Sequence, residues 1–388
     1  MYSSRKNIGV GVKMMQILLF TLACLFIGHG SMTVGAQTGD GAAAAKAVLA
    51  KNDPAYQQVG RQLLSAATAG QAAVVEELLA KGGDQEFRNR QGRTPLILAA
   101  QKGHNPVVEL LVKNGADLEA RDSGGWTALI FAALTGQTDT VKLLLKLGAD
   151  AKASGVAERN ALMVAAEYGR LGTVSLLIEQ GFALEALNKR GRTILMAAAS
   201  ANKLEMVKML LDNGAEVNTS NDKGVTALHI AAREGHHGIV AVLLDRGAIL
   251  ESRDRNAWTP LVDAAFAGHL QTIRLLLDRG ADVQVADVFG YNSLHFAADY
   301  GYVEICTMLI DRGIDVEAQD NEGLTSLMWA AGRGRLEIVK LLLARGADRG
   351  VTDKAGETAS VMARKNGHPA VVELLTGKAP TENKEGSK

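Results

Sequence analysis

The adjacent histidines His236 and His237 are the first residues of this sequence that suggest chemistry, because imidazole nitrogens are common metal ligands. A metal site needs ligands that converge at fixed spacings, and no such pattern accompanies this pair. Most histidines instead recur at two positions. Four directly follow a glycine, and two stand three residues after a threonine or asparagine: His104, His236, His269, His368, His229 and His295. We therefore predict that these rings hydrogen-bond to loop backbone, and that the chain binds no metal and no cofactor.

Cys306 is a candidate nucleophile, but the residues 33 positions before and after it are Ile273 and Val339. A thiol in a position that otherwise holds branched apolar residues is typical of a buried core cysteine. The sequence contains no phosphate-binding loop, nucleophile motif or paired-carboxylate cluster. We therefore predict that this protein is not an enzyme.

Asp263 is the one carboxylate that departs from its neighbours in the pattern. The equivalent positions hold apolar residues: Leu98, Phe131, Ile230 and Phe296. A charged side chain is costly to bury unless it is paired. Two interpretations follow: Asp263 points into solvent on the exposed face of a helix, or it contacts a partner molecule. We favour the first.

The elements that must position these residues repeat every 33 residues, without an insertion, in ten copies from about Gln58 to Thr376. The period is clearest at a threonine or asparagine: Thr94, Thr127, Asn160, Thr193, Thr226, Thr259, Asn292, Thr325 and Thr358. A leucine, an Ala-Ala pair, a glycine and a Gly-Ala-Asp type ending follow it in most copies. A fixed period of this length indicates a stack of repeated units.

Each unit is predicted to form two short helices. The threonine is an N-cap for the first helix, and a proline such as Pro95 suits the position after it. The glycine ends that helix, and the second helix carries an apolar stripe, for example Val339 and Leu342. The last unit departs from the pattern at Ser360 and Arg364, which place polar groups on a face with no further neighbour. We expect the first and last units to act as caps.

The segment Asp222–His236 reads D-K-G-V-T-A-L-H-I-A-A-R-E-G-H. It resembles the ankyrin repeat, whose pattern is D-x-x-G-x-T-P-L-H-x-A-A-x-x-G-H and ends in G-A-D. The resemblance covers residues 58–377 and implies an all-α-dominated repeat solenoid of ten stacked helix-turn-helix units with finger-like hairpin connections. It also implies non-catalytic binding of a protein on a concave surface, lined by the finger tips and the exposed part of the first helices.

Aromatic residues make up only 4% of the chain, yet several gather in adjoining units at positions that the repeat leaves free. Trp, Tyr and Arg are the residue types that dominate interface hot spots. We predict a partner-binding site formed by Trp126, Trp258, Phe266, Phe289, Tyr291, Tyr300, Trp329 and Arg333, with Phe296 nearby. The alternative is that these rings pack on neighbouring fingers and stabilise the stack.

A second group of free positions is basic: Arg90, Arg93, Arg159, Lys189, Arg190 and Arg192. These side chains belong to the finger tips of the second, fourth and fifth units. They are either solvated tips or a surface for an acidic partner.

Residues 1–36 differ in composition from the rest and resemble a secretory signal peptide. Three basic residues precede an apolar run, and small residues stand before an expected cleavage after Ala36. The run is shorter than the ~20 residues that span a membrane. We therefore expect a periplasmic or secreted mature protein. An uncleaved anchor and a lipid-modified Cys24 remain alternatives.

The remaining flanks are expected to be a linker at residues 37–57 and a disordered tail at residues 378–388. The formal charge is balanced, with 42 basic and 42 acidic residues, and no basic stripe is present. This balance argues against binding of nucleic acid, which depends on neutralising phosphates.

The sequence therefore predicts a monomeric scaffold that binds one unidentified protein outside the cytoplasm, with no membrane span in the mature chain. Two alternatives stay open. The protein is either a secreted effector that binds host proteins, or a stoichiometric inhibitor or immunity protein for an enzyme or toxin.

Overall fold

The computed structural model describes residues 53–155, 158–189 and 191–377, which all lie in one compact unit of the chain, Lys46–Lys388. Within these ranges there are twenty helices and no strand, apart from four isolated bridges between single residues. None of these helices is both long and apolar enough to cross a membrane.

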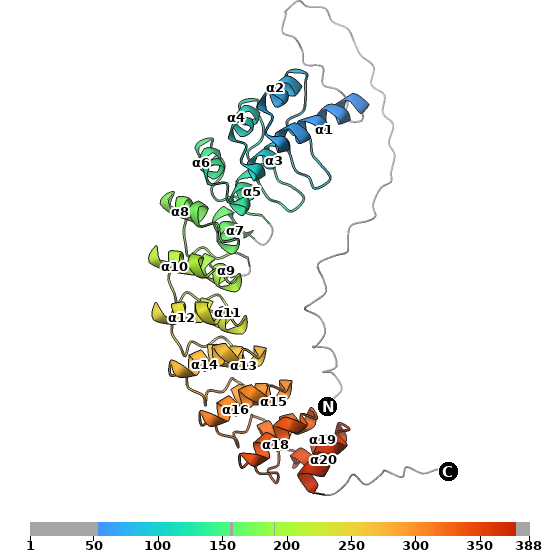
Figure 1. Ribbon diagram of the computed structural model, residues 1–388, viewed down its shortest axis with the longest axis vertical. Coiled ribbons are helices and arrows are strands. Elements are labelled where there is room, and N and C mark those ends of the chain that lie inside the picture. The colour runs from blue at the N-terminus through green and yellow to red at the C-terminus, as the bar shows by residue number, and fades with distance from the viewer. Residues whose placement is uncertain (1–52, 156–157, 190, 378–388) are drawn as a thin grey trace, which may run out of the picture. The chain divides into compact units, whose positions relative to one another are not determined.

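The helices form two rows, which Figure 1 shows as the odd-numbered and the even-numbered helices. The first helices of the pairs are α1 (Pro54–Ala69), α3 (Pro95–Lys102), α5 (Ala128–Thr135), α7 (Ala161–Glu167), α9 (Ile194–Ser200), α11 (Ala227–Arg233), α13 (Pro260–Ala267), α15 (Ser293–Tyr300), α17 (Ser326–Gly332) and α19 (Ala359–Lys365). The second helices are α2 (Ala72–Ala80), α4 (Asn105–Lys113), α6 (Thr138–Lys146), α8 (Leu171–Glu179), α10 (Leu204–Asp212), α12 (His237–Asp245), α14 (Leu270–Asp278), α16 (Val303–Asp311), α18 (Leu336–Ala344) and α20 (Pro369–Thr376). Each helix packs on its partner, each first helix packs on the next first helix, and the second helices pack on one another in the same way except at α8 and α10. This all-α repeat solenoid confirms the predicted fold class.

The threonine and asparagine at the start of each unit act as the predicted N-caps. In α3, α5, α7, α9, α11, α13, α15 and α17, the capping side chain accepts a hydrogen bond from the backbone N–H three residues on. The last unit differs, because the Thr358 hydroxyl contacts the Ser360 hydroxyl at 3.0 Å and caps no N–H. Arg364 is exposed there, as expected of a terminal unit.

The core lies between the two rows and between neighbouring pairs. Leu261, Ala264 and Ala265 of α13 are buried, and the small alanines let α11 and α15 approach closely on either side. Cys306 of α16 has no exposed surface, which confirms the prediction of a core cysteine. Burial raises the pKa of its thiol to about 12, so the reactive thiolate is disfavoured.

Helix α1 begins at Pro54, inside the segment that we expected to be a linker. Asp53 caps the helix by accepting from the Ala55 N–H at 2.7 Å, and proline suits the first helical position. Tyr56 of this extension packs on Phe87 and donates to Asp84 at 2.6 Å. The extension therefore packs on the segment that connects the first unit to the second. The predicted signal peptide, the rest of the predicted linker and the predicted tail lie outside the described residues.

One side chain per unit joins most neighbouring units. Its oxygen accepts the backbone N–H of the residue 31 positions later, at 2.6–3.0 Å, in Glu86–Asp117, Glu119–Asp150, Glu185–Glu216, Asn218–Ile249, Glu251–Asp282, Gln284–Asp315 and Glu317–Asp348. Within the residues that the structure describes, the series is interrupted at Lys152, because an ammonium group can only donate hydrogen bonds and cannot accept one. The contact between the α5–α6 unit and the α7–α8 unit therefore lacks this inter-unit hydrogen bond.

Replacing Lys152 with glutamate should supply this bond to the backbone N–H of Ala183. We expect the free energy of unfolding to rise by about 1 kcal/mol, the usual net value of one hydrogen bond. Chemical denaturation of the full chain measures the change. Lys152→Met is the control, since it removes the ammonium group without adding an acceptor. Equal stabilisation by the two variants would show that the gain does not come from a hydrogen bond to the Ala183 N–H.

Candidate protein-interaction surface

Aspartate turns fix the backbone of the fingers that carry several of the aromatic residues. Asp254 Oδ1 accepts the Trp258 N–H at 2.9 Å. Asp287 Oδ1 accepts the N–H groups of Phe289 at 2.8 Å and Tyr291 at 2.9 Å. Because the carboxylate replaces solvent for these N–H groups, each finger has one defined conformation.

The rings of three adjoining units form one continuous group, which we call the aromatic surface: Trp258, Phe266, Phe289, Tyr291, Phe296, Tyr300 and Trp329. Their ring centroids lie 5.0–5.9 Å apart in the pairs Trp258–Phe266, Trp258–Phe296, Phe266–Tyr300, Tyr291–Phe296, Tyr291–Trp329 and Phe289–Tyr291. The residues come from α13, α15 and α17 and from the fingers before them. The structure thus brings together six of the residues predicted for partner binding, together with Phe296.

The aromatic surface has an exposed part and a half-buried part. Phe289 is 55% exposed and Tyr300 is 42% exposed, whereas the other five rings are half-buried. The indole N–H of Trp258 donates to Asp287 at 3.0 Å, and that of Trp329 donates to Asp320 at 3.1 Å. Trp258 therefore also holds the following finger, as the alternative interpretation proposed, and Trp329 holds the finger of its own unit. Within the described ranges, the Phe289 and Tyr300 rings form no hydrogen bond of this kind.

Arg333 follows α17 and lies beside the aromatic surface. Its Nε donates to Asp299 Oδ1 at 2.5 Å and its Nη2 to Asp299 Oδ2 at 3.3 Å. The carboxylate of Asp299 is buried, while the Arg333 side chain is 60% exposed. Asp299 therefore fixes the direction of a guanidinium group that is accessible to solvent.

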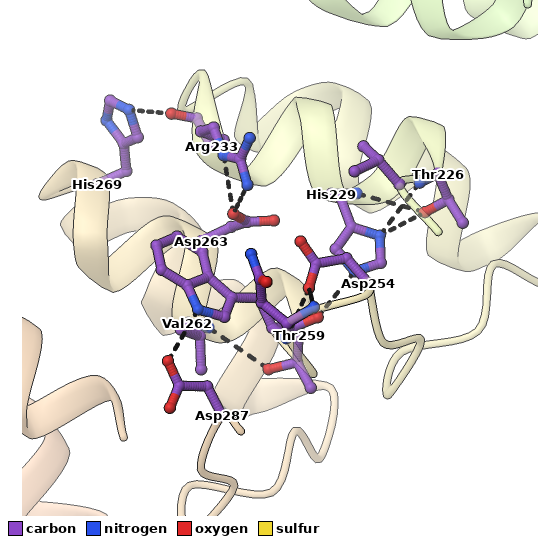
Figure 2. A network of polar contacts seen from close by, with 12 residues as sticks. Thr226, His229, Arg233, Asp254, Thr259, Val262, Asp263, His269 and Asp287 are labelled. Atoms are coloured by element: carbon purple, nitrogen blue, oxygen red, sulfur yellow. Dashed lines mark hydrogen bonds and ion pairs between the residues drawn. The ribbon is translucent and has the colours of Figure 1, made fainter. Parts of the chain in front are cut away.

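Asp263 does not point into solvent, so the interpretation that we favoured is wrong. The side chain of this α13 residue is fully buried and faces Arg233 at the end of α11, as Figure 2 shows. Arg233 Nε donates to Asp263 Oδ1 at 2.8 Å, and Nη2 donates to the same oxygen. Asp263 Oδ2 is buried and has no hydrogen-bond partner among the described residues. The guanidinium group of Arg233 also lies 5.7 Å from the centre of the Trp258 ring.

Burial raises the pKa of the Asp263 carboxyl group to about 7, although Arg233 acts in the opposite direction. An unfolded aspartate has a pKa near ~4. The folded chain therefore holds a proton that the unfolded chain releases between these two values. This contribution favours folding below about pH 4 and is lost as the pH rises through the folded pKa.

Comparison of the wild type with Asp263→Asn should isolate this titration. We expect the unfolding free energy of the wild type, minus that of the variant, to fall between about pH 4.5 and 7. The slope is at most about 1.4 kcal/mol per pH unit, the value for one proton. Urea denaturation over a pH series measures both proteins. A difference that stays constant over this range would contradict the raised pKa.

The two parts of the aromatic surface should respond differently to truncation. Trp258→Ala removes a half-buried ring with three aromatic or cationic contacts and a hydrogen bond to Asp287, so we expect a loss of about 2 kcal/mol of stability. Phe289→Ala should cost less than about 0.5 kcal/mol, because the ring is mostly exposed. Thermal and chemical unfolding of both variants test this. A cost for Phe289→Ala equal to that of Trp258→Ala would show that the exposed ring also stabilises the stack.

Five of the six histidines have the structural role that we predicted. His104, His236 and His269 each place Nε2 2.9–3.3 Å from a carbonyl oxygen of the preceding unit. His229 and His295 are buried, and each contacts a carbonyl oxygen of the next unit at 3.1 Å. Burial lowers the pKa of both rings. Within the described ranges, no group of three or more histidine, cysteine or acidic side chains is arranged to hold a metal ion.

Trp126, the remaining predicted residue, lies apart from the aromatic surface. Its ring packs on Phe131 at 5.5 Å, and the Arg159 guanidinium group lies 5.2 Å from it.

The basic finger tips around Trp126 are partly neutralised. Ion pairs join Arg93 to Asp122, Arg159 to Glu167 and Lys189 to Glu158. Arg190 lies outside the described residues. These pairs weaken the interpretation of the tips as a surface for an acidic partner.

A family model described as ankyrin repeats, in three copies, matches the chain at residues 63–155, 151–221, 218–287, 250–320 and 294–386. These matches cover most of the sequence, so the chain belongs to the ankyrin repeat family. No curated protein matches it. Ankyrin repeats indicate a scaffold for protein–protein interaction, and proteins built from them are generally non-catalytic.

Proposed function

We propose that this protein is a non-catalytic scaffold that binds a partner protein through the aromatic surface. The observation that carries the proposal is the exposure of Phe289 and Tyr300 beside Arg333. The two exposed rings pack against half-buried rings of the aromatic surface. Aromatic residues are otherwise few in this chain. An exposed aromatic and arginine group on a packed support is typical of an interface hot spot.

The ordered fingers beneath the exposed rings reduce the entropy cost of binding. The backbone of the fingers is fixed by aspartate turns, and neighbouring fingers are joined by backbone bonds such as Val288 N–H to Asn256 O at 3.0 Å. A surface that is ordered before binding loses little conformational entropy when the partner arrives. A few exposed anchors are then sufficient for specific binding.

We also propose that the scaffold acts as a monomer outside the cytoplasm, in the periplasm or after secretion. The support for this location is the sequence of residues 1–36, with its basic start, apolar run and small residues before Gln37.

Affinity capture from an extract of the native cells tests the binding proposal. The full chain is compared with the double variant Phe289→Ala/Tyr300→Ala, which removes two exposed anchors at little cost in stability. We expect the wild type to retain one partner that the variant releases, with a loss of affinity of at least about tenfold. The control is Ile249→Ala/Val303→Ala, which removes two other exposed apolar side chains outside the aromatic surface.

Equal retention of the partner by the wild type and the Phe289/Tyr300 variant would exclude the aromatic surface as the binding site. Equal loss in the variant and the control would show that binding depends on general surface hydrophobicity.

A further inference from the structure

Two arginines flank the aromatic surface, and each is held by a buried carboxylate. Arg233 is paired with Asp263 near Trp258, and Arg333 is paired with Asp299 next to Tyr300. Both carboxylates are buried, while the Arg233 and Arg333 side chains are 42% and 60% exposed. The surface therefore presents guanidinium groups outward and keeps the carboxyl groups that pair with them inside.

Both guanidinium groups keep donors for a ligand. Arg233 uses Nε and Nη2 on Asp263, and Arg333 uses Nε and Nη2 on Asp299. Their Nη1 groups form no hydrogen bond within the part of the chain that the structure describes. An arginine that is already oriented by one carboxylate loses little freedom when a second carboxylate binds.

The finger before α13 adds positive charge beside the aromatic surface. Arg253 and Arg255 on the finger before α13 are exposed and form no ion pair among the described residues. The nearby carboxylates of Asp254 and Asp287 are occupied by finger N–H groups. Glu234, at the end of α11, is the exposed acidic residue next to Arg233.

We propose that the aromatic surface receives an extended protein segment in which apolar side chains lie between two acidic residues. The proposal rests on the proposed function and names the class of partner. The acidic residues bind Arg233 and Arg333, and the apolar side chains contact Phe266, Phe289 and Tyr300.

The spacing of the acidic residues follows from the stack. Arg233 and Arg333 lie at the ends of α11 and α17, which are separated by three helix-to-helix steps of about 8–10 Å. An extended chain covers about 3.3 Å per residue. Arg233 reaches forward to Asp263 on α13 and Arg333 reaches back to Asp299 on α15, so the two guanidinium groups are about two steps apart rather than three. The two carboxylates should therefore stand about six residues apart in the partner segment.

Fluorescence anisotropy with the full chain and three labelled peptides tests this. The first peptide has glutamates about six residues apart with leucine and phenylalanine between them. The second has lysines in place of the glutamates, and the third has serines in place of the apolar residues. We expect only the first to bind, with an affinity that weakens as the salt concentration rises.

Variants of the two arginines locate the contacts. Arg233→Gln and Arg333→Gln should each weaken binding of the first peptide by about tenfold. The control Arg279→Gln should have no effect, because Arg279 forms a comparable ion pair with Asp245 in the row of second helices. Thermal unfolding is recorded for each variant, and Arg233→Lys provides a folded alternative that keeps the charge without the planar donor pair.

Binding of the lysine peptide, or equal binding of the serine peptide, would overturn the proposal. So would unchanged affinity in both arginine variants. A captured natural partner that is lost from Phe289→Ala/Tyr300→Ala but retained by Arg233→Gln and Arg333→Gln would leave the proposed function standing and remove only the acidic segment.

Discussion

The structure depends on the contact between neighbouring units. A first helix such as α11 has seven residues and its partner α12 has nine, too few for either to be stable alone in water. Each pair buries its leucines and alanines only when another pair lies on both sides. Stability is therefore shared along the stack as a sum of unit and interface terms.

The same contact also builds the candidate binding surface. Trp258 reaches Asp287 in the following unit, Arg233 reaches Asp263, and Arg333 reaches back to Asp299. These three side chains are therefore oriented by residues of other units. A side chain that is buried for support in one unit, such as Asp263, determines what the adjoining unit presents to a partner. This coupling explains how a regular scaffold acquires one distinctive surface.

The fold could be predicted from the sequence because the 33-residue period places equivalent residues in equivalent environments. Thr94 and Thr259 cap helices, Cys306 packs in the core and His269 binds loop backbone, as their repeated positions required. The period fails where a position is variable. Arg233 stands where other units have Ser200, Phe266 or Asp299, so nothing in the pattern indicated the partner of Asp263.

The start of α1 was missed for a different reason. Asp53-Pro54 is an N-cap signal, but it lies before the first repeat, so the 33-residue period could not identify it. The position of the aromatic residues in adjoining units was visible in the sequence. Their division into exposed and half-buried rings was not, because it depends on side-chain rotamers and on hydrogen bonds such as that between Trp329 and Asp320.

Hydrogen–deuterium exchange of the full chain, with and without its captured partner, tests the central claim most directly. The claim is that an already ordered stack binds through its aromatic surface. We expect added protection in the fingers and helix ends that carry Trp258, Phe289 and Tyr300, with little change in α12, α14, α16 and α18. Protection confined to those second helices, or to the fingers that carry Arg93 and Arg159, would contradict it.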